Sequence, residues 1–106
     1  MPKYLLHVNY VGDGIKGLLK DGGTKRRAAA EKAIKSLGGS VEVFYFAFGD
    51  TDAYLIGEAP DNASMAALAL AVSASGAVTV KTTVLMTPEE LDAAAKKKPT
   101  YRPPGQ

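Results

Sequence analysis

The stretch Val41–Glu58, VEVFYFAFGDTDAYLIGE, predicts two strands joined by a tight turn at Gly49-Asp50. Glycine at the first central position suits a type II′ turn, because it adopts positive φ without strain. With this two-residue loop Phe46 faces Ala53 across the hairpin, whereas a three-residue loop would turn every side chain to the other face. The loop length therefore decides which residues of the hairpin share a face.

The first strand of this hairpin is apolar on both faces. Residues Val43 to Phe48 do not alternate between apolar and polar side chains, as half-buried antiparallel strands do. Each aromatic side chain can bury about 150–250 Å², and soluble monomers rarely expose contiguous apolar patches larger than a few hundred Å². Both faces therefore need a cover. The chain's own helices can cover one face, and we expect a second copy of the chain to cover the other.

The composition fits one small domain, because the chain has 106 residues of which 46% are hydrophobic. It has no cysteine and one histidine, which excludes disulfides and a thiol nucleophile and argues against a structural zinc site. We expect no metal and no cofactor. No apolar run is long enough to span a membrane, and the first residues lack a signal-peptide pattern, so we expect a cytoplasmic protein without a membrane partner.

The net charge of +2 comes from the end of the chain. Residues 96–106 form a basic, Pro-rich tail, and the remaining residues 1–95, the expected domain, are slightly acidic. This distribution is a poor one for nucleic-acid binding. The tail is either a loose end or an arm that grips a neighbouring subunit. Its cationic residues are Lys96, Lys97, Lys98 and Arg102.

The order of the predicted elements indicates the fold. Strand, helix, hairpin, helix and strand is the ferredoxin-like βαββαβ order. Right-handed crossovers place the four antiparallel strands in the order 4-1-3-2 with both helices on one face. The helix at residues 62–75 is apolar nearly all round, which suggests burial on more than one side. A short C-terminal helix opens with the capping sequence Thr87-Pro88-Glu89-Glu90. The other expected elements are strands 3–10 and 77–87, a short helix that ends at Gly22-Gly23, and a helix at 24–37.

Side-chain alternation gathers the unusual residues on the sheet face that the helices leave open. If Tyr4, Leu6 and Val8 face the helices, His7 and Asn9 face the other way. A mixed polar and aromatic lining of this kind suits a small-molecule cleft between paired subunits. The candidate ligand-binding residues are His7, Asn9, Tyr45, Asp52, Tyr54, Lys81 and Thr83.

Two stretches, LLKDGGTKRRAAAEKAIKSLGG and FYFAFGDTDAYLIGEAPDNASMAALALAV, resemble the GYD domain proteins, small bacterial proteins of unassigned function. The resemblance covers roughly Lys3 to Asp92. The family is named after a Gly, Tyr, Asp signature at the hairpin, and this sequence has Gly49 and Asp52 but Thr51 in place of the tyrosine. The resemblance implies a ferredoxin-like fold of the dimeric α/β-barrel type, and it implies no activity.

Each candidate residue has a chemical and a structural interpretation. His7 could act as a general base oriented by Asp52 or Tyr54, which makes these three the catalytic candidates, or it could pack at a subunit interface. Asp52 could instead cap the hairpin turn, and Tyr45 and Tyr54 could be cross-strand packing partners. Lys81 could hold an acidic ligand or be an ordinary exposed charge.

Two functions follow from these interpretations. The preferred one is a homo-oligomeric ligand-binding or structural module, a homodimer or higher, with a cleft between the sheets of paired subunits and a small anionic or aromatic ligand. The alternative is a cofactor-independent enzyme, similar to the isomerases and monooxygenases built on dimeric α/β barrels, that acts on a small aromatic or carbonyl compound. This step is an analogy at the level of the fold. Whether the protein is an enzyme stays open at this point.

Overall fold

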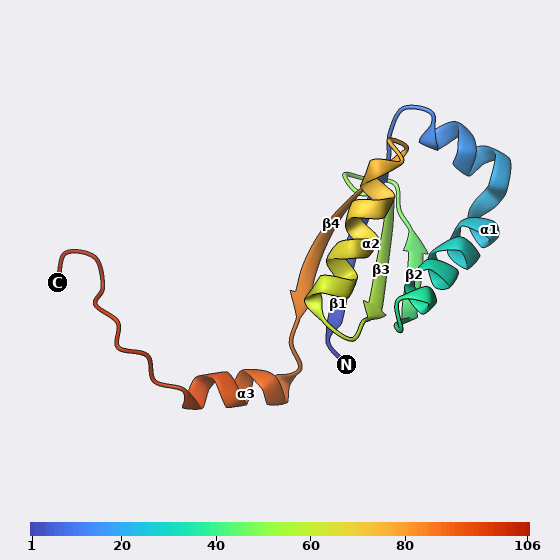
Figure 1. Cartoon of the computed structure of the whole chain (residues 1–106). Coiled ribbons are helices and arrows are strands. Elements are labelled where there is room, and N and C mark those ends of the chain that lie inside the picture. The colour runs from blue at the N-terminus through green and yellow to red at the C-terminus, as the bar shows by residue number, and fades with distance from the viewer.

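The computed structural model describes residues 1–106 and has the predicted ferredoxin-like βαββαβ architecture with an additional C-terminal helix (Figure 1). The four strands form one antiparallel sheet in the order β2-β3-β1-β4, which is the predicted order 4-1-3-2. The elements are β1 (Lys3–Tyr10), α1 (Gly14–Ser36), β2 (Ser40–Phe46), β3 (Ala53–Glu58), α2 (Asn62–Ala74), β4 (Val78–Leu85) and α3 (Pro88–Lys96).

The hydrophobic core lies between one face of the sheet and the helices α1 and α2. Alternation along β1 turns Tyr4 and Leu6 into this core, where both are almost fully buried. The hydroxyl of Tyr4 donates a hydrogen bond of 2.6 Å to Asn62 Oδ1 at the start of α2, so this buried phenol is satisfied. The central cluster consists of Tyr4, Leu6, Ile34, Leu55, Ala59, Met65 and Leu68.

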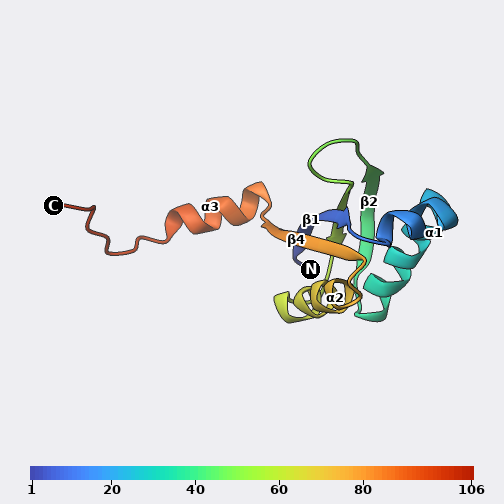
Figure 2. The same cartoon turned by 90° about the horizontal axis from the view of Figure 1, so that it is seen from above.

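Both helices that pack on the sheet lie on the same side of it, and no helix covers the opposite face (Figure 2). On that open face Tyr45 is 70% exposed and Tyr54 is 40% exposed. The outer side of α2 is also uncovered in the single chain, because only Met65 and Leu68 of this helix are buried and Leu70 is 72% exposed. The chain therefore buries one face of the sheet and one side of α2. The open sheet face and the outer side of α2 stay exposed in the single chain.

The long helix α1 bends at Gly22, close to the predicted break. Gly22 has φ 79° and ψ 165°, a conformation that is almost restricted to glycine, and helical structure resumes after it. The two predicted helices are therefore the two halves of one kinked element. The first half turns away from the sheet, which leaves Ile15 and Leu19 exposed (Figure 1).

The β2–β3 hairpin has the predicted register but not the predicted turn. Phe46 pairs with Ala53 and Tyr45 pairs with Tyr54, as a two-residue loop at Gly49-Asp50 requires. The prediction of a type II′ turn was wrong, because Gly49 is not among the glycines with positive φ. The Ala47 amide donates to the Asp52 carbonyl at 2.8 Å, so the loop has four residues, 48–51.

A β-bulge interrupts β2 between Val41 and Val43. The strand pairs Val41 with Gly57 and Val43 with Ile56, so Glu42 is the extra residue. The bulge was not predicted, and it places Glu42 on the open face beside Val43.

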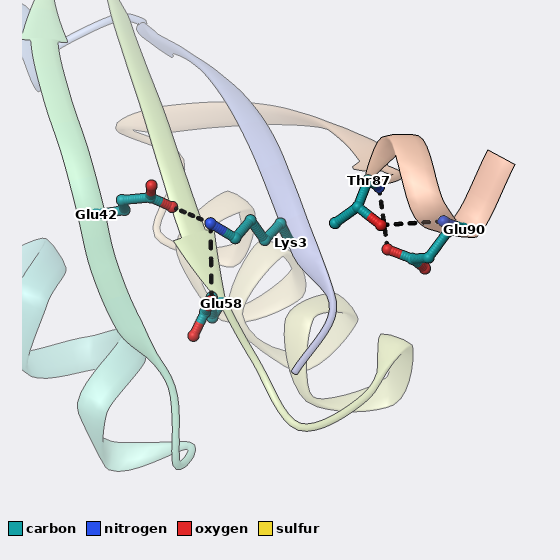
Figure 3. A network of polar contacts seen from close by, with 5 residues as sticks. All are labelled: Lys3, Glu42, Glu58, Thr87 and Glu90. Atoms are coloured by element: carbon teal, nitrogen blue, oxygen red, sulfur yellow. Dashed lines mark hydrogen bonds and ion pairs between the residues drawn. The ribbon is translucent and has the colours of Figure 1, made fainter. Parts of the chain in front are cut away.

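The C-terminal helix α3 begins with the predicted capping box (Figure 3). Thr87 Oγ1 accepts from the Glu90 amide at 3.1 Å, and Glu90 Oε1 accepts from the Thr87 amide at 3.0 Å. No residue of α3 is buried, and the helix and the tail after it extend away from the sheet (Figures 1 and 2). The helix therefore has a well-defined start, but none of its residues is buried against the rest of the chain.

Candidate functional site

Four of the predicted site residues form one row across the whole open face. Tyr45 on β2 pairs with Tyr54 on β3, Tyr54 pairs with His7 on β1, and His7 pairs with Lys81 on β4. Paired residues in adjacent antiparallel strands have Cβ atoms about 4.5–5.5 Å apart. The row therefore combines two phenols, an imidazole and an ammonium group on one continuous surface.

Within this row, His7 contacts Tyr54 edge to face. Their ring centroids are 5.2 Å apart and their planes are inclined by 67°. Such T-shaped pairs are favourable because the positive edge of one ring meets the negative face of the other. Packing is therefore sufficient to explain the orientation of His7, which is only half-buried.

Asp52 and Asn9 form a second row, and the structure gives both a structural role. Asp52 Oδ2 accepts a hydrogen bond from the backbone amide of Tyr10 at 2.9 Å, and Asn9 Oδ1 accepts from the backbone amide of Asp52 at 2.9 Å. The Asp52 amide also lies 3.0 Å from the Val8 carbonyl. These bonds fasten the β2–β3 loop to the end of β1. The carboxylate of Asp52 accepts from β1 and not from an amide of its own turn, so the predicted turn cap was wrong.

Thr83 lies apart from the other candidates. It pairs with Leu5 on β1, which in turn pairs with Ile56 on β3, and Val43 on β2 completes this row. Three of these four side chains are aliphatic. The open face is thus divided into a polar row, an aromatic and basic row, and an apolar row.

A fourth row is charged, and it was missing from the predicted site. Lys3 Nζ lies 2.8 Å from Glu42 Oε2 and 3.9 Å from Glu58 Oε1, so one ammonium group links three strands (Figure 3). The hydrogen bond from Lys3 to Glu42, aided by the charge of Glu42, raises the pKa of Lys3 above its ordinary value. Alternation alone would have placed Lys3 and Glu58 on this face, but only the bulge adds Glu42.

None of the four principal hollows of the molecule is lined by His7. Asp52 lines a hollow on the other side of the loop, beside Phe46, Phe48 and the first half of α1. No three His, Asp or Glu side chains come together in a group that could hold a metal ion. No helix combines the length and the apolar character that a membrane span requires.

The family model of the GYD domain matches residues 4–95 of the 106-residue chain. The chain belongs to the GYD domain family. In this GYD domain the signature position with threonine in place of tyrosine, Thr51, is buried next to the Asp52 hydrogen bonds. Comparison with curated proteins and with solved structures finds no match.

Proposed function

We propose that this GYD domain is a homo-oligomeric binding or structural module in which two open sheet faces meet and enclose a small-molecule cleft. One observation carries the proposal: the helices cover a single face of the sheet, and the other face holds exposed aromatic side chains. Tyr45 is 70% exposed there, although large aromatic residues are the side chains that gain most from burial. A second copy of the chain supplies a surface of the same kind.

The arrangement of the open face in rows supports a pair related by two-fold symmetry. In a two-fold interface the same patch serves both partners, so the patch must be complementary to itself. The apolar row around Leu5 and Ile56 can meet its own copy without unpaired charges. In the charged row both glutamates already have a cationic partner within the subunit, because Lys3 contacts Glu42 and Glu58, and the row keeps a single net negative charge.

The projecting arm is a second support. Leu91 on α3 is 62% exposed and Tyr101 in the tail is 72% exposed. The helix α3 and the tail project away from the sheet (Figure 1). A helix with a fixed capping box and an exposed leucine is suited to pack on another chain. In the proposed assembly the arm adds contacts outside the paired sheets.

The cleft of such a pair would be lined by the row Tyr45, Tyr54, His7 and Lys81. Aromatic faces and a lysine suit a small anionic or aromatic ligand, since the ammonium group can pair with an acid while the rings stack. The polar row with Asn9 and Asp52 borders this lining, and Thr83 borders it on the apolar side.

A pair of variants tests the location of the interface. Tyr45→Arg places a charge in the aromatic row of the open face, on the edge strand β2 of the proposed sheet-to-sheet contact. Leu70→Arg makes the same kind of change at an equally exposed position on the outer side of α2. We expect sedimentation velocity to show that Tyr45→Arg weakens self-association by about a hundredfold or more, because a desolvated, unpaired charge is strongly unfavourable. Leu70→Arg should leave association unchanged. If Leu70→Arg dissociates the protein while Tyr45→Arg does not, the interface is on the helices and the proposed cleft does not exist.

A further inference from the structure

A cavity lies on the opposite, helix-covered side of the sheet, between the strands and the helices α1 and α2. It has a volume of about 120 Å³, and thirteen of its fourteen lining residues are apolar or aromatic. Its α1 wall is formed by small side chains, Ala29, Ala30 and Ala33, while Leu68 and Val72 of α2 close the other side. The small side chains leave the space that larger ones would fill.

Voids of this size are uncommon in close-packed protein interiors. An apolar cavity of about 150 Å³ in another protein stays dry and binds benzene. The cavity of this chain is therefore of the right order for one ring or a short branched acyl group.

Arg26 is the polar member of the lining, and it lacks a partner. Its Nε atom is buried without a hydrogen bond, and no acidic side chain lies within ion-pair distance of the guanidinium. The guanidinium carbon lies 5.9 Å from the ring centre of Tyr10, a cation–π arrangement that fixes its position. The next residue, Arg27, is by contrast paired with Glu31 at 3.3 Å. A buried donor without an acceptor is unfavourable, and native proteins rarely keep one without a reason.

A second hollow adjoins the cavity at Arg26. It is more polar, shares Tyr10, Arg26, Val72 and Val78 with the cavity, and is also lined by Asp13 and Asp21. Arg26 thus stands at the junction between an apolar chamber and a polar mouth. Arg26 supplies one cationic group at this junction, which matches a ligand with a single carboxylate.

We propose that this chamber binds a small amphiphilic monocarboxylate, with its single ring or short acyl group among the alanines and its carboxylate on Arg26. Guanidinium and carboxylate match each other in a two-point hydrogen bond, which would satisfy the free Nε. The site is separate from the proposed cleft, because it lies on the other face of the sheet and belongs to one subunit. It does not depend on oligomerisation.

The test is a titration of the ¹⁵N-labelled full-length chain with benzoate, followed by amide chemical shifts. We expect saturable shifts at residues around the chamber, such as Ala30, Leu68 and Val72, and weaker binding of the uncharged analogue benzamide. Arg26→Met should reduce the affinity for benzoate by about tenfold or more, because a charged hydrogen bond is lost while the apolar volume is kept. Arg27→Met, at the neighbouring exposed arginine, should leave the affinity unchanged.

Filling the chamber gives a second test that does not depend on the charge. Ala30→Leu should abolish benzoate binding while the thermal unfolding midpoint stays the same or rises, since cavity-filling substitutions commonly stabilise. The proposal is overturned if benzoate causes no saturable shifts, if Arg26→Met binds it as tightly as the wild type, or if the shifts lie around His7 and Tyr54. The last outcome would place the ligand in the open-face cleft and support the proposed function alone.

Discussion

Asp52 shows how one side chain can hold a loop in place. Its carboxylate accepts from the Tyr10 amide, and its own amide is held by Asn9 and by the Val8 carbonyl. Asp52→Ala removes the acceptor for a partly buried amide, so we expect a loss of about 1–3 kcal/mol in the free energy of unfolding. Urea unfolding with an unchanged slope would measure this loss.

Asp52→Asn is the matched control, because its amide oxygen can still accept from Tyr10. It should lose clearly less stability than Asp52→Ala. Equal losses in the two variants would mean that the negative charge, and not the hydrogen bond, is what the fold requires at this position.

Asp61 gives the domain a pH-dependent helix cap. Its side chain accepts from the Ser64 amide at 2.8 Å, and this hydrogen bond lowers the pKa of Asp61 below its ordinary value of 3.8. Because the folded state binds the proton less readily than the unfolded state, the stabilisation is complete above pH 3.8 and is lost as the pH falls through the lowered pKa.

Asp61→Asn keeps a good cap but removes the titration. We therefore expect the difference in thermal midpoint between the wild type and Asp61→Asn to become smaller as the pH is lowered from 6 towards about 3. A difference that stays constant over this range would show that the cap does not titrate with folding.

Among the elements, α1 depends most on a single glycine. Gly22 has φ 79°, so Gly22→Ala should destabilise the domain by about 1–3 kcal/mol, although no neighbouring atom lies within 4 Å of the added methyl group. Gly17, in the first half of the same helix, has equally open surroundings and no positive φ. Gly17→Ala should therefore stabilise by about 0.5–1 kcal/mol. Thermal or urea unfolding of both variants checks the prediction, and a neutral Gly22→Ala would mean that α1 can straighten at no cost.

Several features of the helices and strands could be predicted from the sequence alone. The Gly, Pro and capping signals were sufficient for the α1 break and the Thr87–Glu90 capping box, because each is a local pattern with one favourable outcome. The strand order followed from the order of the elements and from the right-handedness of crossover connections. Alternation was sufficient to bring His7, Tyr45, Tyr54 and Lys81 to one face.

Other features depend on long-range packing and could not be predicted in this way. The bulge at Glu42 changes the alternation at one residue and thereby creates the Lys3 network. The loop around Gly49 is wider than predicted, and the Asp52 carboxylate that was expected to cap it accepts from the Tyr10 amide of β1. The isolation of Arg26 beside a cavity depends on how two helices pack, which no short pattern in the sequence records.

At the scale of the whole molecule, the chain combines a small domain with a projecting arm. It extends over 56 × 33 × 23 Å because α3 and the tail project from a small domain (Figure 2). The open sheet face and the arm both carry apolar or aromatic side chains that are exposed in the single chain, among them Tyr45 and Leu91. A second copy of the chain would remove both from water, which is the basis of the proposed assembly.

The most direct test of this assembly is the mass of the wild-type protein in solution, measured by multi-angle light scattering during size-exclusion chromatography at micromolar concentration. The proposed assembly requires twice the chain mass of 11.1 kDa, or a higher multiple. A mass of 11.1 kDa at every concentration tested would contradict it, since the open face would then be stable in water without a partner.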